Sequence, residues 1–142
     1  MRIRHKPWAK PELEACPFYI KNPQECIGHW REQFKQNDKP LYIELGCGKG
    51  GFISQIAPAH PEFNFIAMDI KNEMLALAKR KLEQAYSEKK KTPDNVRIAI
   101  QNIERMHLAW NENDSVDRIY INFCNPWSKN KHKKRRLTHT RQ

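Results

Sequence analysis

The sequence predicts an α/β fold built around a parallel sheet, and three observations support this prediction. Short apolar segments alternate with helix-like segments from residue 39 onward. A cluster of glycines directly follows the first of these apolar segments, as in strand-to-helix turns that approach a ligand. No internal repeat or low-complexity linker interrupts the alternation. We expect right-handed crossovers, which would place helices on both faces of the sheet.

The individual elements follow from local pattern. Strands are expected at residues 41–45, 63–70, 96–101 and 116–123. A helix is expected over residues 51–60, ending at Pro58 or shortly after, and a longer amphipathic helix over residues 71–91. In the longer helix, apolar residues recur at helical spacing: Met74, Leu75, Ala78, Leu82 and Tyr86. Residues 102–110 predict a short helix or turn, and residues 129–142 the start of a further helix.

The first part of the chain differs from the rest. Residues 1–38 are predicted to form a basic arm, because Pro7, Pro11, Pro17 and Pro23 favour extended backbone. A short helix is expected within the arm, around Glu25–Phe34. Residues 39–142 then form the expected α/β domain. With only four strands and three crossovers, this domain is expected to be an incomplete doubly wound sheet whose C-terminal strands are missing.

Composition limits the function classes. The 142 residues include 26 Lys and Arg against 16 Asp and Glu, a formal net charge of +10, which indicates a polyanionic partner. No apolar run approaches the length of a membrane span, and the start has no signal-peptide core. The four cysteines form no CxxC pair: Cys16, Cys26, Cys47 and Cys124. We therefore expect reduced thiols in a cytoplasmic protein, and no metal site.

The glycine-rich segment IELGCGKGG fits two ligand-binding patterns. Gly46, Gly48 and Gly51 match G-x-G-x-x-G, whereas Gly46, Gly48 and Gly50 match G-x-G-x-G. In either pattern the glycines let the backbone turn sharply and come close to a ligand. The alternative is a tight strand-to-helix turn with no ligand.

Two acidic residues refine the choice of ligand. Asp69 ends the second strand, at the spacing expected of a ribose-binding carboxylate. Glu44 lies two residues before the first glycine, where it would repel a pyrophosphate but attract the ammonium and sulfonium groups of S-adenosylmethionine. The pattern therefore favours an S-adenosylmethionine site over the NAD(P) site of an oxidoreductase. Asn102, just after the third strand, is placed either to hydrogen-bond the adenine or to cap a following helix.

The end of the fourth strand is a second candidate for the site. Open α/β sheets bind ligands beyond the carboxyl ends of their strands, and residues 122–127 fall there. Pro126 fixes the turn, and Trp127 is either a wall of the pocket or an ordinary core residue. The basic run of residues 128–136 leads directly out of this predicted pocket. It would either contact phosphates or form a solvated helix face.

Three segments carry a resemblance to a known family: MRIRHKPWA, IELGCGKGGFI and YINFCNPWSKNKHKKRRLTH. They resemble the bacterial tRNA (guanine-N7)-methyltransferase family, which modifies the variable-loop guanosine 46 of tRNA. The resemblance covers nearly the whole chain. It implies a Rossmann-like class I S-adenosylmethionine-dependent methyltransferase fold and tRNA as partner, with no membrane association. It leaves open whether the protein is a monomer or a homodimer.

The resemblance also assigns site residues. Cofactor contacts are expected at Glu44, Gly46, Gly48, Asp69, Asn102 and Asn125, and substrate contacts at Lys129, His132, Arg135 and Arg136. Asn125 is expected at the reaction centre, at a position where the family often has Asp. An amide there accepts a hydrogen bond from guanine but lacks the charge of a carboxylate. The family continues for another third of a domain with further substrate-binding motifs, so the 142 residues alone are expected to be incomplete.

Two other functions remain open from sequence. The first is an amino-methyltransferase acting on nucleic acid, although Asn125-Pro126-Trp127 lacks the second proline of the Asn/Asp-Pro-Pro-aromatic signature. The second is a non-catalytic RNA-binding fragment that keeps the basic surface but cannot close its pocket. The lack of an obvious His–carboxylate pair does not exclude N7 methylation, because guanine N7 has a lone pair and no proton to remove.

Overall fold

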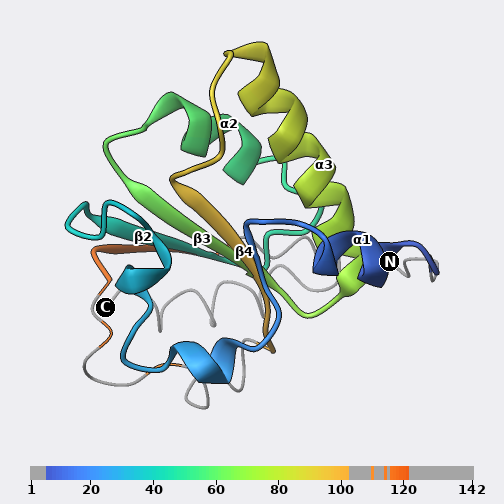
Figure 1. Cartoon of the computed structure of the whole chain (residues 1–142), viewed down its shortest axis with the longest axis horizontal. Helices are drawn as coiled ribbons and strands as arrows, with labels where there is room; N and C mark the ends of the chain where they lie inside the picture. Colours follow the sequence, from blue (N-terminus) through green and yellow to red (C-terminus); the bar gives the residue numbers. More distant parts are fainter. Residues whose placement is uncertain (1–5, 103–109, 111–113, 115, 122–142) are drawn as a thin grey trace, which may run out of the picture.

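The computed structural model describes residues 6–102, 110, 114 and 116–121 (Figure 1). The strands in this part are β1 (Tyr19–Ile20), β2 (Leu41–Leu45), β3 (Asn64–Asp69), β4 (Val96–Ile100) and β5 (Arg118–Ile121). The helices are α1 (Ala9–Glu14), α2 (Ile53–Ala59) and α3 (Asn72–Glu88), with two 3-10 helices, η1 (Pro23–Cys26) and η2 (Arg31–Gln33). The strands and helices predicted between residues 41 and 100 are found, with small shifts at their ends, and β5 lies within the strand predicted at residues 116–123. The helix or turn predicted for residues 102–110 and the helix predicted from residue 129 fall outside the described residues.

The described strands form one parallel sheet in the order β1-β4-β3-β2-β5. The chain steps from β2 to β3 to β4 in one direction and then returns to place β5 on the other side of β2. Successive strands are therefore added in opposite directions from β2, which makes the position between β2 and β5 the topological switch point of the sheet. Open α/β sheets bind ligands at such a switch point. This arrangement confirms the predicted Rossmann-like α/β fold.

Both faces of the sheet are buried. Helices α2 and α3 connect β2 to β3 and β3 to β4, and two right-handed crossovers in the same direction put them on the same face (Figure 1). Helix α1 packs against α3 on that face. The other face is covered by the 3-10 helices and by Trp110, whose ring stacks on that of Trp30 with centroids 4.4 Å apart. The crossover from β4 to β5 falls largely outside the described residues, so the expectation of α-helices on both faces stays a prediction.

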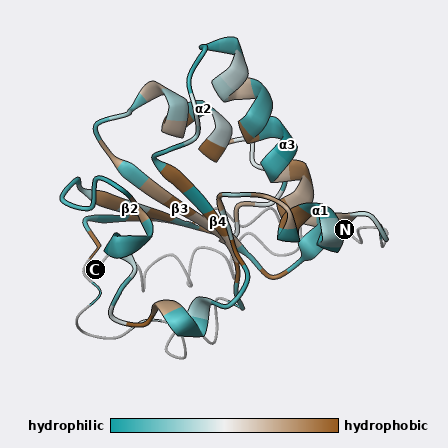
Figure 2. Cartoon of the chain, viewed as in Figure 1, coloured by the Kyte–Doolittle hydropathy of each residue, from teal (hydrophilic) through white to brown (hydrophobic). Residues whose placement is uncertain are grey.

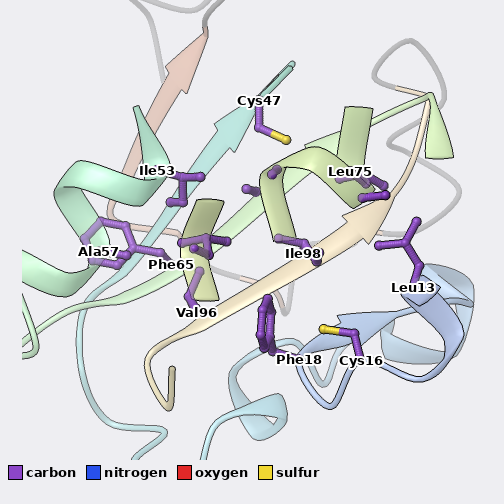
Figure 3. Close-up of a cluster of buried hydrophobic side chains, with 14 of the residues drawn as sticks. Leu13, Cys16, Phe18, Cys47, Ile53, Ala57, Phe65, Leu75, Val96 and Ile98 are labelled. Carbon is purple, nitrogen blue, oxygen red and sulfur yellow. The ribbon is translucent and has the colours of Figure 1, made fainter. Parts of the chain in front are cut away.

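Alternation along the strands gives each face its own core. Phe65 and Ala67 of β3 pack toward the helices, whereas Ile66 and Met68 pack toward the 3-10 side. Figure 2 shows hydrophobic residues concentrated in the strands and hydrophilic residues over much of α3. Figure 3 shows the cluster on the helical side, where residues from the arm, the helices and the sheet meet.

The prediction of an extended arm is wrong in two places. Helix α1 forms despite Pro11, because this proline lies in the first turn, where backbone N–H groups have no partner within a helix. Leu13 of α1 is fully buried in the main core. Downstream, β1 pairs in parallel with β4, Tyr19 opposite Ile98, and adds an edge strand that was not predicted.

The short helix expected around Glu25–Phe34 is also replaced. Two 3-10 helices form there, separated by Gly28, whose φ of 79° cannot continue a right-handed helix. The Asp114 carboxylate holds this bend by accepting hydrogen bonds from the backbone N–H of Gly28 (2.6 Å) and of Trp30 (3.3 Å). The division of the chain at residue 38 stays a prediction.

An ion-pair cluster fastens α1 to α3. The Glu12 carboxylate accepts hydrogen bonds from Arg80 Nε at 2.8 Å and Nη2 at 2.7 Å, and from Lys79 Nζ at 3.2 Å. The Arg80 guanidinium also lies 3.9 Å from the centroid of the Trp8 ring. The hydrogen bonds from Arg80 are the main reason that the pKa of Glu12 falls to about 2.

Replacing Glu12 with glutamine should lower the free energy of unfolding by about 1 kcal/mol near neutral pH. The folded-state pKa lies below the ordinary value of 4.5, so the carboxylate stabilises the fold above that value and the effect is lost as pH falls toward about 2. Thermal unfolding of the wild type and Glu12→Gln at a series of pH values should show a gap that shrinks in acid. Glu14→Gln, which removes an exposed pair with Lys21, is the control and should change stability less. A gap independent of pH would contradict the assignment.

Candidate functional site

The candidate site lies at the edge of the sheet where the carboxyl ends of the parallel strands meet. Glu44 is the residue before the last of β2, Asp69 ends β3, and Asn102 follows β4 by two residues. The register places Leu45 opposite Met68 and Asp69 opposite Ile100, so these strand ends are level with one another. The structure thus brings together the described residues that the sequence assigned to a cofactor.

The glycine loop after β2 follows the G-x-G-x-G pattern in its backbone geometry. Gly46, Gly48 and Gly50 have φ angles of 76°, 55° and 85°, values that L side chains rarely adopt, whereas Gly51 does not have a positive φ. Gly50 has a second requirement. A Cβ added there would lie 2.8 Å from both Cα and Cβ of Ala78 in α3, so the glycine allows the loop to touch the helix.

Asp69 holds the glycine loop in place. Its Oδ2 accepts a hydrogen bond from the backbone N–H of Gly48 at 2.8 Å. Its Oδ1 accepts hydrogen bonds from the N–H groups of Ile70 at 2.8 Å and Lys71 at 3.2 Å. The carboxylate is therefore fixed in orientation between the loop and the start of α3. A carboxylate has about four acceptor positions, so these bonds leave capacity for a ligand hydroxyl.

Glu44 contributes a buried carboxyl group two residues before the glycine loop. Its side chain is only 2% exposed, and its strand is flanked by β3 on one side and by β5 on the other. The register places Ala67 and Tyr120 opposite Glu44 on these two neighbours. In such a low-dielectric position a carboxylate attracts a cation and repels an anion more strongly than it would in water. The loop is therefore better suited to a positively charged ligand group than to a phosphate.

The row of polar groups continues past Asp69. The backbone N–H of Gln101 donates a hydrogen bond to the carbonyl oxygen of Asp69 at 2.9 Å, which places Asn102 next along the edge. Asn102 lines a hollow of about 300 Å³ together with Asn22 and Gln24 of the arm. Sequence reasoning missed this hollow, because the arm was not expected to pair with the sheet.

The remaining predicted site residues lie outside the described part of the chain. They are Asn125, Lys129, His132, Arg135 and Arg136. Their expected roles in cofactor and substrate binding stay predictions.

The described residues also bear on what the composition led us to expect of cysteines, metal ligands and membrane-spanning helices. Cys16, Cys26 and Cys47 are buried free thiols, and burial raises the pKa of Cys16 and Cys26, which keeps them neutral. Within this part of the chain, no group of three or more His, Cys, Asp or Glu side chains is arranged to hold a metal ion. No helix there has the length and apolar character needed to cross a membrane.

The parallel sheet and the glycine loop at its edge are those of a Rossmann-like methyltransferase domain. Over residues 38–142 the chain matches a family described as "Putative methyltransferase", and it belongs to this family. This family acts with a methyl donor.

Individual relatives narrow the comparison. A tRNA (guanine-N(7)-)-methyltransferase of Clostridium beijerinckii is 58% identical over 142 residues, which are 100% of this chain and 64% of that protein. Proteins of the same name from Clostridium perfringens (strain SM101) and Acetivibrio thermocellus are 56% and 54% identical, again over 100% of this chain and over 65% of each relative. The resemblance predicted from the three sequence segments is confirmed. The chain spans 64 to 65% of the length of these relatives.

Proposed function

We propose that the protein containing this chain is a tRNA (guanine-N7)-methyltransferase, which transfers a methyl group from S-adenosylmethionine to N7 of a variable-loop guanosine. The observation that carries the proposal is the identity of 54 to 58%, over all 142 residues, to relatives bearing that name. The net charge of +10 supports a nucleic-acid substrate. A tRNA-modifying enzyme of this kind would act in the cytoplasm.

The cofactor is proposed to lie along the edge of the sheet described above. The methionine part would lie at the glycine loop, where the buried charge of Glu44 favours its ammonium and sulfonium groups. The ribose would lie at Asp69, whose carboxylate is already oriented by Gly48, and the adenine at Asn102. A dinucleotide fits this edge less well, because its pyrophosphate would come close to Glu44.

In the proposed reaction, the main role of the protein is to align the methyl donor with guanine N7. Bound S-adenosylmethionine supplies an electrophilic methyl group on a positively charged sulfur. Because guanine N7 attacks with an in-plane lone pair, no side chain has to remove a proton, and the rate depends on alignment and on local electrostatics. In the proposal, Asn125 accepts a hydrogen bond from the guanine, and Lys129, His132, Arg135 and Arg136 bind the tRNA.

Product mapping tests the proposed reaction. The whole protein, incubated with tRNA and labelled S-adenosylmethionine, should place the label on guanine N7, where methylation makes the nucleoside sensitive to reductive strand cleavage. A label on an exocyclic amine would instead support the amino-methyltransferase. Calorimetry with S-adenosylmethionine addresses the third possibility, since a non-catalytic RNA-binding module need not bind the cofactor.

Replacing Lys129 with alanine should weaken tRNA binding several-fold at moderate salt and lower the slope of log K against log[salt] by roughly 1. Fluorescence anisotropy over a range of KCl concentrations measures both quantities. Lys35→Ala is the matched control, because Lys35 is an exposed lysine far in the sequence from the predicted basic segment. Unchanged affinity and slope for Lys129→Ala would remove this residue from the tRNA interface.

A further inference from the structure

A second pocket lies at the edge of the sheet opposite the candidate site. It has a volume of about 410 Å³ and is formed by residues that precede β2, β3 and β4 and by residues that follow α3. The charged residues that line it are Lys39, Lys90, Lys91 and Asp94. Because three ammonium groups face one carboxylate, this lysine pocket attracts an anion.

Buried polar side chains form the floor of the lysine pocket. The Tyr86 hydroxyl donates a hydrogen bond to Oδ1 of Asn95, and the two residues are 2% and 6% exposed. Nδ2 of this asparagine donates to three carbonyl oxygens, those of Ala57 (3.0 Å), His60 (3.1 Å) and Phe63 (3.0 Å). These bonds join the end of α3 and the start of β4 to the segment between α2 and β3. The pocket is therefore formed before any ligand binds.

Backbone carbonyls position two of the three ammonium groups. Nζ of Lys39 donates a hydrogen bond to the carbonyl oxygen of Pro61 at 2.6 Å. Nζ of Lys91 donates to the carbonyl oxygen of Pro58 at 3.4 Å. An ammonium group has three donors, and each of these bonds uses one of them. Further donors of both lysines can therefore bind an anion in the pocket.

The third lysine has a backbone conformation that favours glycine. Lys90 has a φ of 55° and is the only non-glycine residue with a positive φ in the part of the chain that the structure describes. It follows Lys89, the C-cap of α3, and its N–H donates to the carbonyl oxygen of Ser87 at 3.0 Å. Glycine is the usual residue at this position of a helix end. A lysine that occupies it against the backbone preference indicates a use for the side chain.

Helix α3 connects the lysine pocket to the proposed cofactor edge. The helix begins at Asn72, three residues after Asp69, and ends at Glu88 beside the pocket (Figure 1). Its 17 residues correspond to a length of about 25 Å. This distance is shorter than a tRNA molecule, so a tRNA with its variable loop at the cofactor edge is long enough to reach the pocket as well.

We infer that the lysine pocket binds a backbone phosphate of the tRNA, at a nucleotide outside the variable loop. The inference rests on the proposed function and adds a second contact to that proposed for residues 128–136. Ammonium groups bind phosphate oxygens through charge-assisted hydrogen bonds and do not read the base. The contact therefore orients the tRNA on the domain without selecting its sequence.

Replacing Lys90 with glycine in the whole protein tests the inference. Glycine adopts a φ of 55° readily, so the melting temperature should stay the same or rise slightly. Affinity for tRNA should fall about three- to tenfold at moderate salt, and the slope of log K against log[salt] should decrease by roughly 1. Fluorescence anisotropy over a range of KCl concentrations measures both quantities. Lys35→Ala removes the same charge from an exposed lysine outside the lining, and it should keep the wild-type affinity.

Two further readouts locate the contact. In Lys90→Gly and Lys91→Gln, KM for tRNA should rise about three- to tenfold, whereas kcat and KM for S-adenosylmethionine should change less than about twofold. Ethylation interference on end-labelled tRNA identifies the phosphates that wild-type binding requires. One such phosphate should lie outside the variable loop, and its ethylation should no longer weaken binding to Lys90→Gly.

The outcomes separate this inference from the proposed function. If the wild type methylates guanine N7 and both variants keep its tRNA affinity and interference pattern, the inference is wrong and the function stands. If calorimetry shows that these variants lose affinity for inorganic phosphate but not for tRNA, the pocket holds a free anion and the inference is again wrong. A lower melting temperature for Lys91→Gln with unchanged tRNA affinity would assign this lysine to the helix dipole of α3 instead. A wild type that binds no tRNA contradicts both the inference and the proposed function.

Discussion

Replacing Gly50 with alanine should lower the free energy of unfolding by about 2 to 4 kcal/mol. Gly50 has a φ of 85°, which an L side chain rarely adopts, and its Cβ would lie 2.8 Å from Cα and Cβ of Ala78. Neither atom is the end of a flexible side chain, so α3 and the loop would have to separate. The same movement would shift Gly48 away from Asp69, so we also expect weaker cofactor binding.

Gly51→Ala provides the matched control one residue further on. A Cβ at Gly51 has no other atom within 4 Å, and Gly51 does not have a positive φ. This substitution should change stability by less than about 1 kcal/mol, with a small gain from the less flexible unfolded chain. Urea denaturation of both variants measures the difference. Equal destabilisation would show that the contact with Ala78 does not limit the loop.

The different environments of Gly50 and Gly51 could not be predicted from the sequence. The letters of the loop fit G-x-G-x-x-G and G-x-G-x-G equally well, so the sequence could not choose between Gly50 and Gly51. The choice depends on φ angles and on how closely α3 approaches, and both result from the packing of elements far apart in the chain. The sequence did predict that a ligand-approaching turn would follow the first buried strand.

Local pattern predicted the elements between residues 41 and 100 because each has a strong signal of its own. The strands are short apolar runs, and α3 has apolar residues at helical spacing. The arm has no such signal. Its prolines suggested extended backbone, yet Pro11 is tolerated in the first turn of α1, and β1 is a two-residue strand that exists only through its pairing with β4.

For the candidate site, sequence predicted positions better than interactions. Glu44, Gly46, Gly48, Asp69 and Asn102 were expected at strand ends, and the parallel sheet brings strand ends to one edge. Their mutual contacts were not foreseen, because the hydrogen bond from Gly48 to Asp69 crosses from one strand end to the next. The hollow beside Asn102 was missed for the same reason, since four of its seven lining residues come from the arm.

Replacing Glu44 with glutamine should weaken the binding of S-adenosylmethionine by about 30-fold, equivalent to roughly 2 kcal/mol. Glutamine has nearly the same shape, so the packing of this 2% exposed side chain in β2 should survive. What is lost is the negative charge proposed to face the ammonium and sulfonium groups. Affinity for 5′-methylthioadenosine, which has the same adenosine part but neither positive group, should change by less than about twofold.

The two ligands measured by calorimetry on the same variant separate charge from structure. If Glu44 only stabilises the fold around the glycine loop, both ligands should lose affinity together, because both depend on the loop and on Asp69. If its charge acts on the methionine part, the loss should be confined to S-adenosylmethionine and should diminish with added salt only weakly, since the site is buried. Glu62→Gln, at an exposed carboxylate before β3, should leave both affinities unchanged. Equal loss for the two ligands would overturn the electrostatic role and, with it, the main physical reason for preferring a sulfonium cofactor at this loop.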